Sequence, residues 1–395
     1  MIFAETLREL SDWQHELYKD LHRHPELSMQ EQRTLGKIRQ EIEAMGLEAT
    51  MIGSVGVAAV LENGEGRTML ARADFDALPV TEDTGLEYSS LTEGVMHACG
   101  HDMHTTALLG ALRALNEHRD AWRGTYIALF QPGEETAQGA QALVDAGLEG
   151  VIPTPDAAFA LHIGPGPADT VAIKKGPTMS AADSIRIKVF GSGSHASTPQ
   201  LAVDPVVLAA SIVLRLQTIV SRTVAPQDFS VVTVGALNAG TKSNVIPDHA
   251  ELLVNLRHYD NAVREKVMEA VQSVVRHECE ISQSPKPPTF EFYDQFPLTS
   301  NNAELVDAIS PNFEKEFEQH FIEAPAGQAS EDFSIIPDAL GAPYVYAFVG
   351  SVDPEEFAQG GPFPGNHSPK YAPAIEPTCL TATRAQITAA LAVLA

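Results

Sequence analysis

Apolar residues recur at helical spacing in two segments near the start of the chain. The segments cover residues 5–21 and 30–45, and Pro25 between them opposes continuation of the first helix. Farther along, short apolar runs alternate with helical patterns. We expect strands at residues 68–73, 125–131 and 157–162, with helices between them at residues 105–115 and 137–148. This alternation predicts an α/β fold with a mainly parallel sheet covered by helices.

The pattern changes near residue 182. The elements expected there follow the order βαββαβ, which is that of the split ferredoxin-like fold. They are a strand at 184–190, a helix at 203–221, strands at 229–237 and 250–257, a helix at 261–278 and a strand at 289–293. A strand at 344–350 and a helix at 377–394 then return to the first pattern. We therefore predict a discontinuous larger domain, 1–181 and 294–395, and a smaller inserted domain, 182–293.

The composition excludes several classes of partner. Lys and Arg total 26 against 52 Asp and Glu, and the resulting formal charge of -26 argues against nucleic acid and anionic membrane surfaces. The N-terminal segment has no signal-peptide pattern, and no apolar run is long enough to span a bilayer. Three cysteines in so long a chain argue against a disulfide framework, so we expect a cytoplasmic protein.

Chemically reactive side chains follow the ends of three predicted strands. Asp74 and Asp76 come after the first, Glu134 and Glu135 after the second, and His162 ends the third. Open α/β sheets place their sites at the carboxyl ends of strands. The sequence therefore predicts that these residues share one pocket.

Further candidate metal ligands occur in two other motifs. HACGHDMH supplies Cys99 and His101, separated by Gly100, which permits a tight backbone, and the Gly/Pro-rich loop GGPFPGNHSPKYAP supplies His367. With Glu135 and His162, these residues offer one thiolate, three imidazoles and one carboxylate, a set that suits zinc or manganese. Taken singly, each has a simpler interpretation: a buried cysteine acts as a small hydrophobe, and a histidine at a strand end or helix start is often structural.

The QPGEET sequence divides two roles between neighbouring glutamates. We interpret Glu135 as a metal ligand and Glu134 as the general base, since adjacent side chains at a strand end point in different directions. The alternative is a solvated acidic pair at a helix N-terminus. Asp76 would fix the tautomer of a ligand imidazole, and Asp74 would do the same or cap a turn.

The inserted domain contributes three polar candidates, His195, Asn244 and Arg257. An arginine paired with an asparagine suits a substrate carboxylate, and a histidine can stabilise an oxyanion. Turn residues and a surface cation are the alternative interpretations of these three.

Taken in order, the motifs resemble those of the M20 metallopeptidases, and specifically the amidohydrolase branch of hippurate hydrolases, auxin-conjugate hydrolases and N-acyl-amino-acid amidohydrolases. The motifs run nearly from end to end of the chain: LHRHPELSMQE, RADFDALP, HACGHDMHTT, QPGEE, GSGSHAS, NVIPD, ASEDF and GNHSPKYAP. Two features depart from the wider pattern. Asp74 stands where the wider superfamily usually has a ligand histidine, and the amidohydrolase branch shares this aspartate. The loop after the glutamates reads TAQGA, whereas the corresponding loop is often rich in glycine.

The resemblance implies a catalytic domain with two divalent ions, zinc or manganese, with cobalt or nickel as alternatives, and an inserted lid domain that often mediates homodimerisation. It implies hydrolysis of a small N-acyl amino acid. By motif position, Glu134 matches the general base and His195 can act across the dimer, while Asn244 and Arg257 hold the substrate carboxylate. The matching metal ligands are Cys99, His101, Glu135, His162 and His367.

Three other functions stay open at the level of sequence. A dipeptidase or carboxypeptidase of the same family would use the same ligands. A cysteine hydrolase would use Cys99 as nucleophile with His101 or His104 as base. That mechanism leaves Glu135, His162 and His367 without a role. A non-catalytic, metal-dependent binding protein on this fold is the third alternative.

Overall fold

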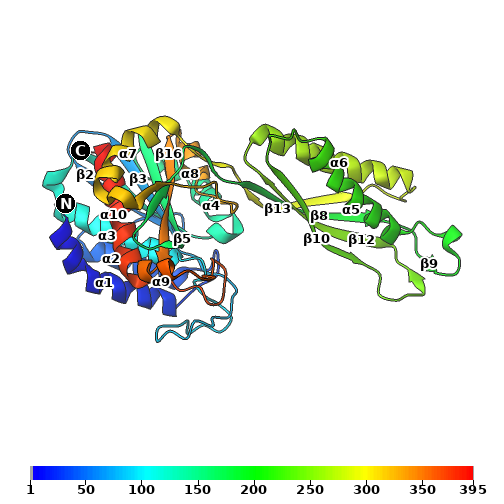
Figure 1. Ribbon diagram of the computed structural model, residues 1–395, viewed down its shortest axis with the longest axis horizontal. Coiled ribbons are helices and arrows are strands. Elements are labelled where there is room, and N and C mark those ends of the chain that lie inside the picture. Colours follow the sequence, from blue (N-terminus) through cyan, green and yellow to red (C-terminus); the bar gives the residue numbers. More distant parts are fainter. Residues whose placement is uncertain (1–2, 395) are drawn as a thin grey trace. The chain divides into compact units, whose positions relative to one another are not determined.

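The computed structural model describes residues 3–394, and these form two compact units (Figure 1). The first contains the described residues up to Thr178, Ser300–Ala326, and the described residues from Asp332 onward. The second contains Met179–Thr299 and also Gly327–Glu331. No sequence pattern had indicated that this last short segment would join the second unit.

A mixed sheet forms the centre of the first unit, with the order β1-β2-β4-β3-β5-β16-β6-β15. Its central strands, β4, β3, β5 and β16, run parallel. The outer strands β1, β2 and β6 each make an antiparallel pair, so the sheet is parallel mainly in its middle. The strand bounds are β1 Thr50–Ile52, β2 Gly56–Asn63, β3 Thr68–Asp74, β4 Gly124–Gln131, β5 Ala157–Pro167, β6 Val171–Ile173, β15 Phe321–Glu323 and β16 Tyr344–Val352.

Long helices cover one face of this sheet. Alternate residues of β3, namely Met69, Ala71 and Ala73, join the apolar core beneath them, so Arg72 and Asp74 point to the opposite face. Helices α3 and α10 contact the strands directly, and α1 packs against both. The helix bounds are α1 Ala4–Arg23, α2 Gln32–Ala44, α3 His101–Glu117, α7 Ala303–Phe317 and α10 Ile375–Leu394.

Shorter elements complete the first unit. Helix α4 is Gly139–Asp145, shorter than the predicted 137–148, and it packs against α8 (Ile335–Leu340). Gly139 is required here because an added Cβ would lie 1.5 Å from the carbonyl oxygen of Pro132. Other bounds are α9 Pro354–Gln359 and the 3-10 helices η1 Arg119–Ala121, η2 Glu134–Thr136, η3 Leu148–Gly150 and η5 Glu318–His320. Strands β7 Gly176–Met179 and β14 Thr299–Asn301 each contain one residue of the second unit.

The second unit has a four-stranded antiparallel sheet in the order β10-β12-β8-β13, with α5 and α6 packed on it. Burial alternates along β12, which shows that one face of the sheet packs against these helices. The bounds are β8 Ala181–Phe190, α5 Pro205–Arg222, β10 Ser230–Ala239, β12 His249–His258, α6 Asn261–Ile281 and β13 Thr289–Phe296, with β9 Ser194–His195, η4 Pro199–Leu201 and β11 Val245–Ile246.

Helix α5 corrects one expectation from the sequence. Among residues 3–394 it is the one helix long and apolar enough to cross a membrane by length and composition. However, Leu208, Ile212, Leu216 and Ile219, spaced along one side of α5, belong to the core that it forms with the sheet. A core helix meets the same criteria, so this finding by itself does not indicate a membrane span.

Candidate metal centre

The parallel strands bring their carboxyl ends to one edge of the first unit's sheet. Asp74 ends β3, and the turn with Glu134 and Glu135 follows β4. His162 lies within β5, which continues to Pro167, so it does not end its strand as predicted. The extra length of β5 follows from its parallel pairing with β16, which continues to Pro167.

All five predicted metal ligands lie together. One set of ligand atoms belongs to Cys99, His101 and His162, and a second belongs to Cys99, Glu135 and His367. The atoms of each set lie within 4.8 Å of one another. Because Cys99 is in both sets, the cluster has the composition of two adjacent cation sites that share one thiolate.

The local backbone explains how Cys99 and His101 reach the same cluster. Gly100 between them has φ 88°, and a Cβ at this position would lie 2.5 Å from Ile163 Cδ1. A larger residue would therefore meet both strain and a collision. The structure thus supports the role predicted for the glycine in this motif.

The orientation of His101 is fixed by Asp76. Nδ1 of His101 donates to Asp76 Oδ1 at 2.9 Å, which leaves Nε2 directed toward the cluster. Burial opposes protonation of His101, but Asp74 and Asp76 outweigh it and raise its pKa well above the ordinary value. A divalent cation beside these carboxylates would replace the proton as their positive partner.

His162 has the complementary arrangement. Its Nδ1 donates to the carbonyl oxygen of Ile163 at 2.7 Å, and its Nε2 lies 3.4 Å from Cys99 Sγ. Burial and the charges of His104 and His101 hold the pKa of His162 well below its ordinary value. A neutral imidazole with a free Nε2 is the form that binds metals.

Two buried atoms indicate that the cluster fits a cation. Nε2 of His101 and Oε1 of Glu135 are buried and have no hydrogen-bond partner among the described residues. Oε1 of Glu135 lies 3.9 Å from His101 Nε2 and 3.3 Å from His367 Nε2. Buried polar atoms without partners are costly, and a divalent ion would satisfy both.

The loop that carries His367 is attached to the same edge. The backbone N–H of His367 donates to the carbonyl oxygen of Ala98 at 2.7 Å, and the φ angle of His367 is 68°. The Asn366 side chain donates to the carbonyl oxygens of Cys99 and Ile163, both at 3.1 Å. Sequence reasoning did not single out Asn366, and its place beside a ligand in the GNHSP motif was the available signal.

His104 is not available as a ligand or as a base for Cys99. Its Nδ1 donates to Asp74 at 2.6 Å, and its Nε2 accepts the backbone N–H of Ile163 at 2.9 Å. Asp74 also receives a hydrogen bond from buried Arg72 at 2.7 Å, so it holds an imidazole in place and does not cap a turn. Burial and the neighbouring Glu135 raise the pKa of the Cys99 thiol, which is unfavourable for a cysteine nucleophile.

The two glutamates of QPGEET are not a solvated pair. Glu134 is 5 % exposed, and the Glu135 side chain is 9 % exposed. Glu134, Glu135 and His101 have ligand atoms within 4.8 Å of one another. Glu134 therefore lies beside the candidate ligands His101 and Glu135.

The three candidates of the second unit are described within that unit. His195 is exposed, and its Nδ1 lies 2.6 Å from Ser197 Oγ. The backbone carbonyl oxygen of Asn244 accepts the N–H of Ala196. Arg257 donates to Asn255 at 2.9 Å and to Ser330 at 2.6 Å. Within the second unit, Arg257 therefore contacts Asn255, which lies two residues before it on β12.

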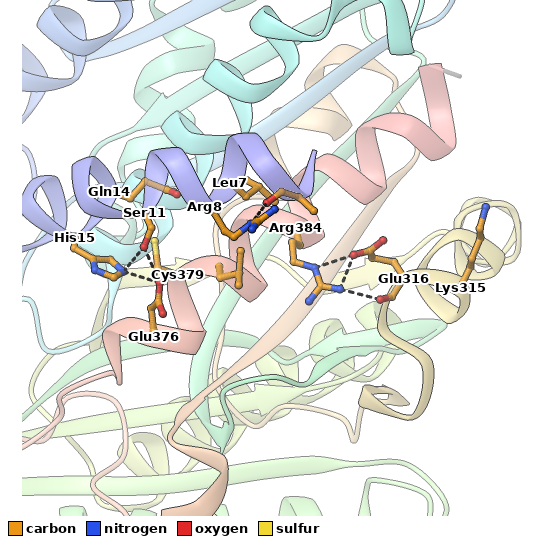
Figure 2. A pocket seen from close by; sticks show the side chains of 12 residues that line it. Leu7, Arg8, Ser11, Gln14, His15, Lys315, Glu316, Glu376, Cys379 and Arg384 are labelled. Carbon is orange, nitrogen blue, oxygen red and sulfur yellow. Dashed lines mark hydrogen bonds and ion pairs between the residues drawn. The ribbon is translucent and has the colours of Figure 1, made fainter. Parts of the chain in front are cut away.

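A separate cavity of about 610 Å³ lies among α1, α7 and α10 (Figure 2). Ser11, His15 and Glu376 meet there, but they do not form a nucleophile–base–acid series. Ser11 donates to Glu376 at 2.7 Å, and the same His15 nitrogen faces both Ser11 and Glu376. Arg384 pairs with Glu316 (Figure 2), so these charged groups bind one another.

Comparison with known proteins decides the family. Residues 70–380 match peptidase family M20/M25/M40. The chain belongs to this family. It is a metal-dependent hydrolase, which excludes the cysteine hydrolase and the non-catalytic binding protein as its class.

Three relatives illustrate the M20 assignment. The chain is 35% identical to an N-acetylcysteine deacetylase of Bacillus subtilis over 86% of this chain and 88% of the relative. It is 36% identical to the hippurate hydrolase of Campylobacter jejuni, over 86% and 89%. A dinuclear metal-binding M20 peptidase of Bacillus subtilis is similar in structure, with a TM-score of 0.80, 29% identity and coverage of 98% of both chains.

Proposed function

We propose that this M20 enzyme hydrolyses the amide bond of small N-acyl amino acids and releases a carboxylic acid and a free amino acid. The observation that carries the proposal is the cluster of Cys99, His101, Glu135, His162 and His367, in which Cys99 and His101 are buried and His367 is exposed, with buried Glu134 beside it. Relatives named for N-acetylcysteine and hippurate, both N-acylated amino acids, support the substrate class.

We propose that the two ligand sets hold two divalent ions, zinc or manganese, with cobalt or nickel as alternatives. One thiolate with imidazoles and a carboxylate suits these borderline-soft ions. When bound, such ions make water a stronger nucleophile and polarise the amide carbonyl. Asp76 keeps His101 in the tautomer that leaves Nε2 free.

In this proposal Glu134 moves the proton of the reaction. It accepts a proton from the attacking water and delivers it to the nitrogen of the leaving amine. The amide C–N bond breaks as the new C–O bond becomes part of the carboxylic acid. Burial of Glu134 limits competing exchange of its proton with solvent water.

For the second unit we propose a ferredoxin-like lid that also mediates homodimerisation. Its chain order, β8-α5-β10-β12-α6-β13, supports this assignment. The division into domains 1–181 with 294–395 and 182–293 is part of the same proposal. His195 would stabilise the oxyanion, and Asn244 and Arg257 would bind the substrate carboxylate. A cytoplasmic location is supported by three free cysteines and a charge of -26.

The test is release of amino acid from N-acetyl, N-benzoyl and N-decanoyl amino acids and from unmodified dipeptides. Each substrate is assayed with metal-loaded enzyme, after chelation, and after metal is restored. We expect metal-dependent release from the N-acyl substrates. Release from dipeptides alone would favour the dipeptidase or carboxypeptidase alternative and overturn the proposed substrate class.

A further inference from the structure

The segment at residues 27–31, the end of the LHRHPELSMQE motif, lies before residues 70–380 that match the family model, and it is joined to the metal-binding edge. Leu27 forms a parallel β-bridge with Ala77, and the N–H of Ala77 donates to the backbone carbonyl oxygen of Glu26 at 2.9 Å. This pairing holds residues 27–31 beside the turn that follows β3. Two side chains of the segment then reach groups that orient the cluster.

Ser28 binds the carboxylate that orients His101. Its hydroxyl donates to Asp76 Oδ2 at 2.7 Å, and the N–H of Glu135 donates to the same oxygen at 3.0 Å. The other oxygen of Asp76 receives the hydrogen bond from His101. One carboxylate therefore connects the Ser28 hydroxyl to a predicted ligand on α3 and to the backbone of another after β4.

Glu31 binds the backbone immediately before the proposed base. Its side chain is 4 % exposed, and Oε1 accepts the N–H of Gly133 at 2.8 Å. Gly133 has φ 57°, and a Cβ there would lie 2.5 Å from Met29 Sδ, within the same segment. A buried carboxylate is retained only with such hydrogen bonds, so this contact fixes the turn that begins with Glu134.

We propose that Ser28 and Glu31 are positioning residues of the reaction. Ser28 acts on metal binding by holding Asp76, and thereby His101 and the Glu135 backbone. Glu31 acts on proton transfer by holding Gly133, and thereby Glu134. The Glu31 part rests on the proposed role of Glu134, whereas the Ser28 part rests only on the metal cluster.

Metal affinity tests Ser28. Groups that hydrogen-bond a metal-binding histidine typically contribute about 10–100-fold to metal affinity. Ser28 acts one hydrogen bond farther out, through Asp76, so we expect Ser28→Ala to weaken zinc binding by about 10-fold, the lower end of this range. Ser28→Thr keeps a hydroxyl and should bind metal more tightly than Ser28→Ala. The matched control is Ser11→Ala, which removes another hydroxyl that donates to a carboxylate, Glu376. Wild-type zinc affinity in folded Ser28→Ala would overturn the Ser28 assignment.

Two substitutions, Glu31→Gln and Glu31→Asp, separate the effect of side-chain length at position 31 from the effect of its charge. Burial and the nearby Asp76 carboxylate raise the pKa of Glu31 to about 7, so a neutral side chain is a fair replacement. Glu31→Gln keeps the length and one acceptor oxygen, while Glu31→Asp keeps the charge but withdraws the oxygen from Gly133. We expect kcat to fall about 10²-fold in Glu31→Asp, because a small misplacement of a reacting group has an effect of this size. KM should be nearly unchanged, and Glu31→Gln should have a higher kcat than Glu31→Asp.

Amide hydrogen exchange provides a readout of Glu31 that does not depend on substrate. Exchange in the peptide containing Gly133 should be faster in Glu31→Asp than in Glu31→Gln. Glu41→Asp is the control, since Glu41 is a carboxylate on α2 that accepts the Trp13 N–H. Equal exchange in both Glu31 variants and wild type would overturn the Glu31 assignment. Faster exchange without any loss of kcat would show that Glu31 holds Gly133 but is not a positioning residue of the reaction, and would also overturn the assignment.

Discussion

Nε2 of His162 lies 3.4 Å from Sγ of Cys99, at a point where the two candidate ligand sets meet. The hydrogen bond from His162 Nδ1 to the Ile163 carbonyl fixes the imidazole in that direction. The other set joins Cys99 to Glu135 and His367. The thiolate is therefore the one predicted ligand whose loss would disturb both cation sites.

Replacement of Cys99 should reduce metal content more than replacement of a ligand in one set. We expect Cys99→Ala to lose most of both ions, while His162→Ala and His367→Ala each retain part of the metal. Elemental analysis of purified, metal-loaded protein measures this directly. Cys279→Ala, which removes a buried thiol of the second unit, should keep full metal content. Full occupancy in Cys99→Ala would show that the thiolate is not a shared ligand.

Replacement of Glu134 should separate catalysis from metal binding. Glu134→Gln preserves size but removes the proton acceptor, so we expect kcat to fall about 10²–10⁴-fold, the usual contribution of a general base. Metal content should stay at the wild-type value, because Glu134 belongs to neither of the two ligand sets that share Cys99. Measuring kcat and metal content on the same preparation distinguishes a general base from a metal ligand. A variant that loses metal together with activity would mark Glu134 as a ligand.

Chelation should lower the stability of the protein. His101 Nε2 and Glu135 Oε1 are buried without hydrogen-bond partners in the described part of the chain, and a bound cation would satisfy them. A ligand at 100 times its Kd adds about 2.7 kcal/mol to the free energy of unfolding. Thermal unfolding at several free zinc concentrations should therefore show a rising Tm. The Tm of Cys99→Ala should respond much less, and a metal-independent Tm in the wild type would argue against the site.

The His22 imidazole should make stability depend on pH. It is fully buried between Asp102, at 2.7 Å, and Glu82, at 3.3 Å. Burial opposes protonation, but the hydrogen bonds to these carboxylates raise the pKa of His22 to about 9. A raised pKa in the folded state means that the contribution is complete below the ordinary value near 6.5 and is lost as pH rises through about 9.

Urea unfolding of His22→Gln tests this contribution. Breaking a buried ion pair costs about 3–5 kcal/mol, and we expect a loss of this size in the free energy of unfolding at pH 6. The difference from wild type should shrink as the pH approaches 9. His249→Gln, which breaks an exposed pair with Asp248, should cost no more than about 1 kcal/mol. A pH-independent difference for His22→Gln would show that the imidazole stabilises the fold as a neutral group.

Local sequence patterns were enough to predict the main elements and the types of candidate ligand. Helical spacing located α1 and α2, because a helix that covers a sheet needs an apolar stripe, and short apolar runs located β3, β4 and β5. Residues after those strands were expected to meet because parallel strands end at one edge. The spacing of Cys99 and His101 around a glycine was equally local information.

The pairing of strands and of side chains could be seen only in the folded chain. Strand β2 lies antiparallel to β4, and this depends on long-range hydrogen bonds that no local pattern specifies. The same limit applies to polar contacts: Asp74 binds His104 and Arg72, and Arg257 donates to Asn255. Ser28 and Glu31 reach the cluster from far along the chain, because folding places residues 27–31 beside the turns after β3 and β4. Residue type fixes what a side chain can bind, but its partners are fixed by packing of distant segments.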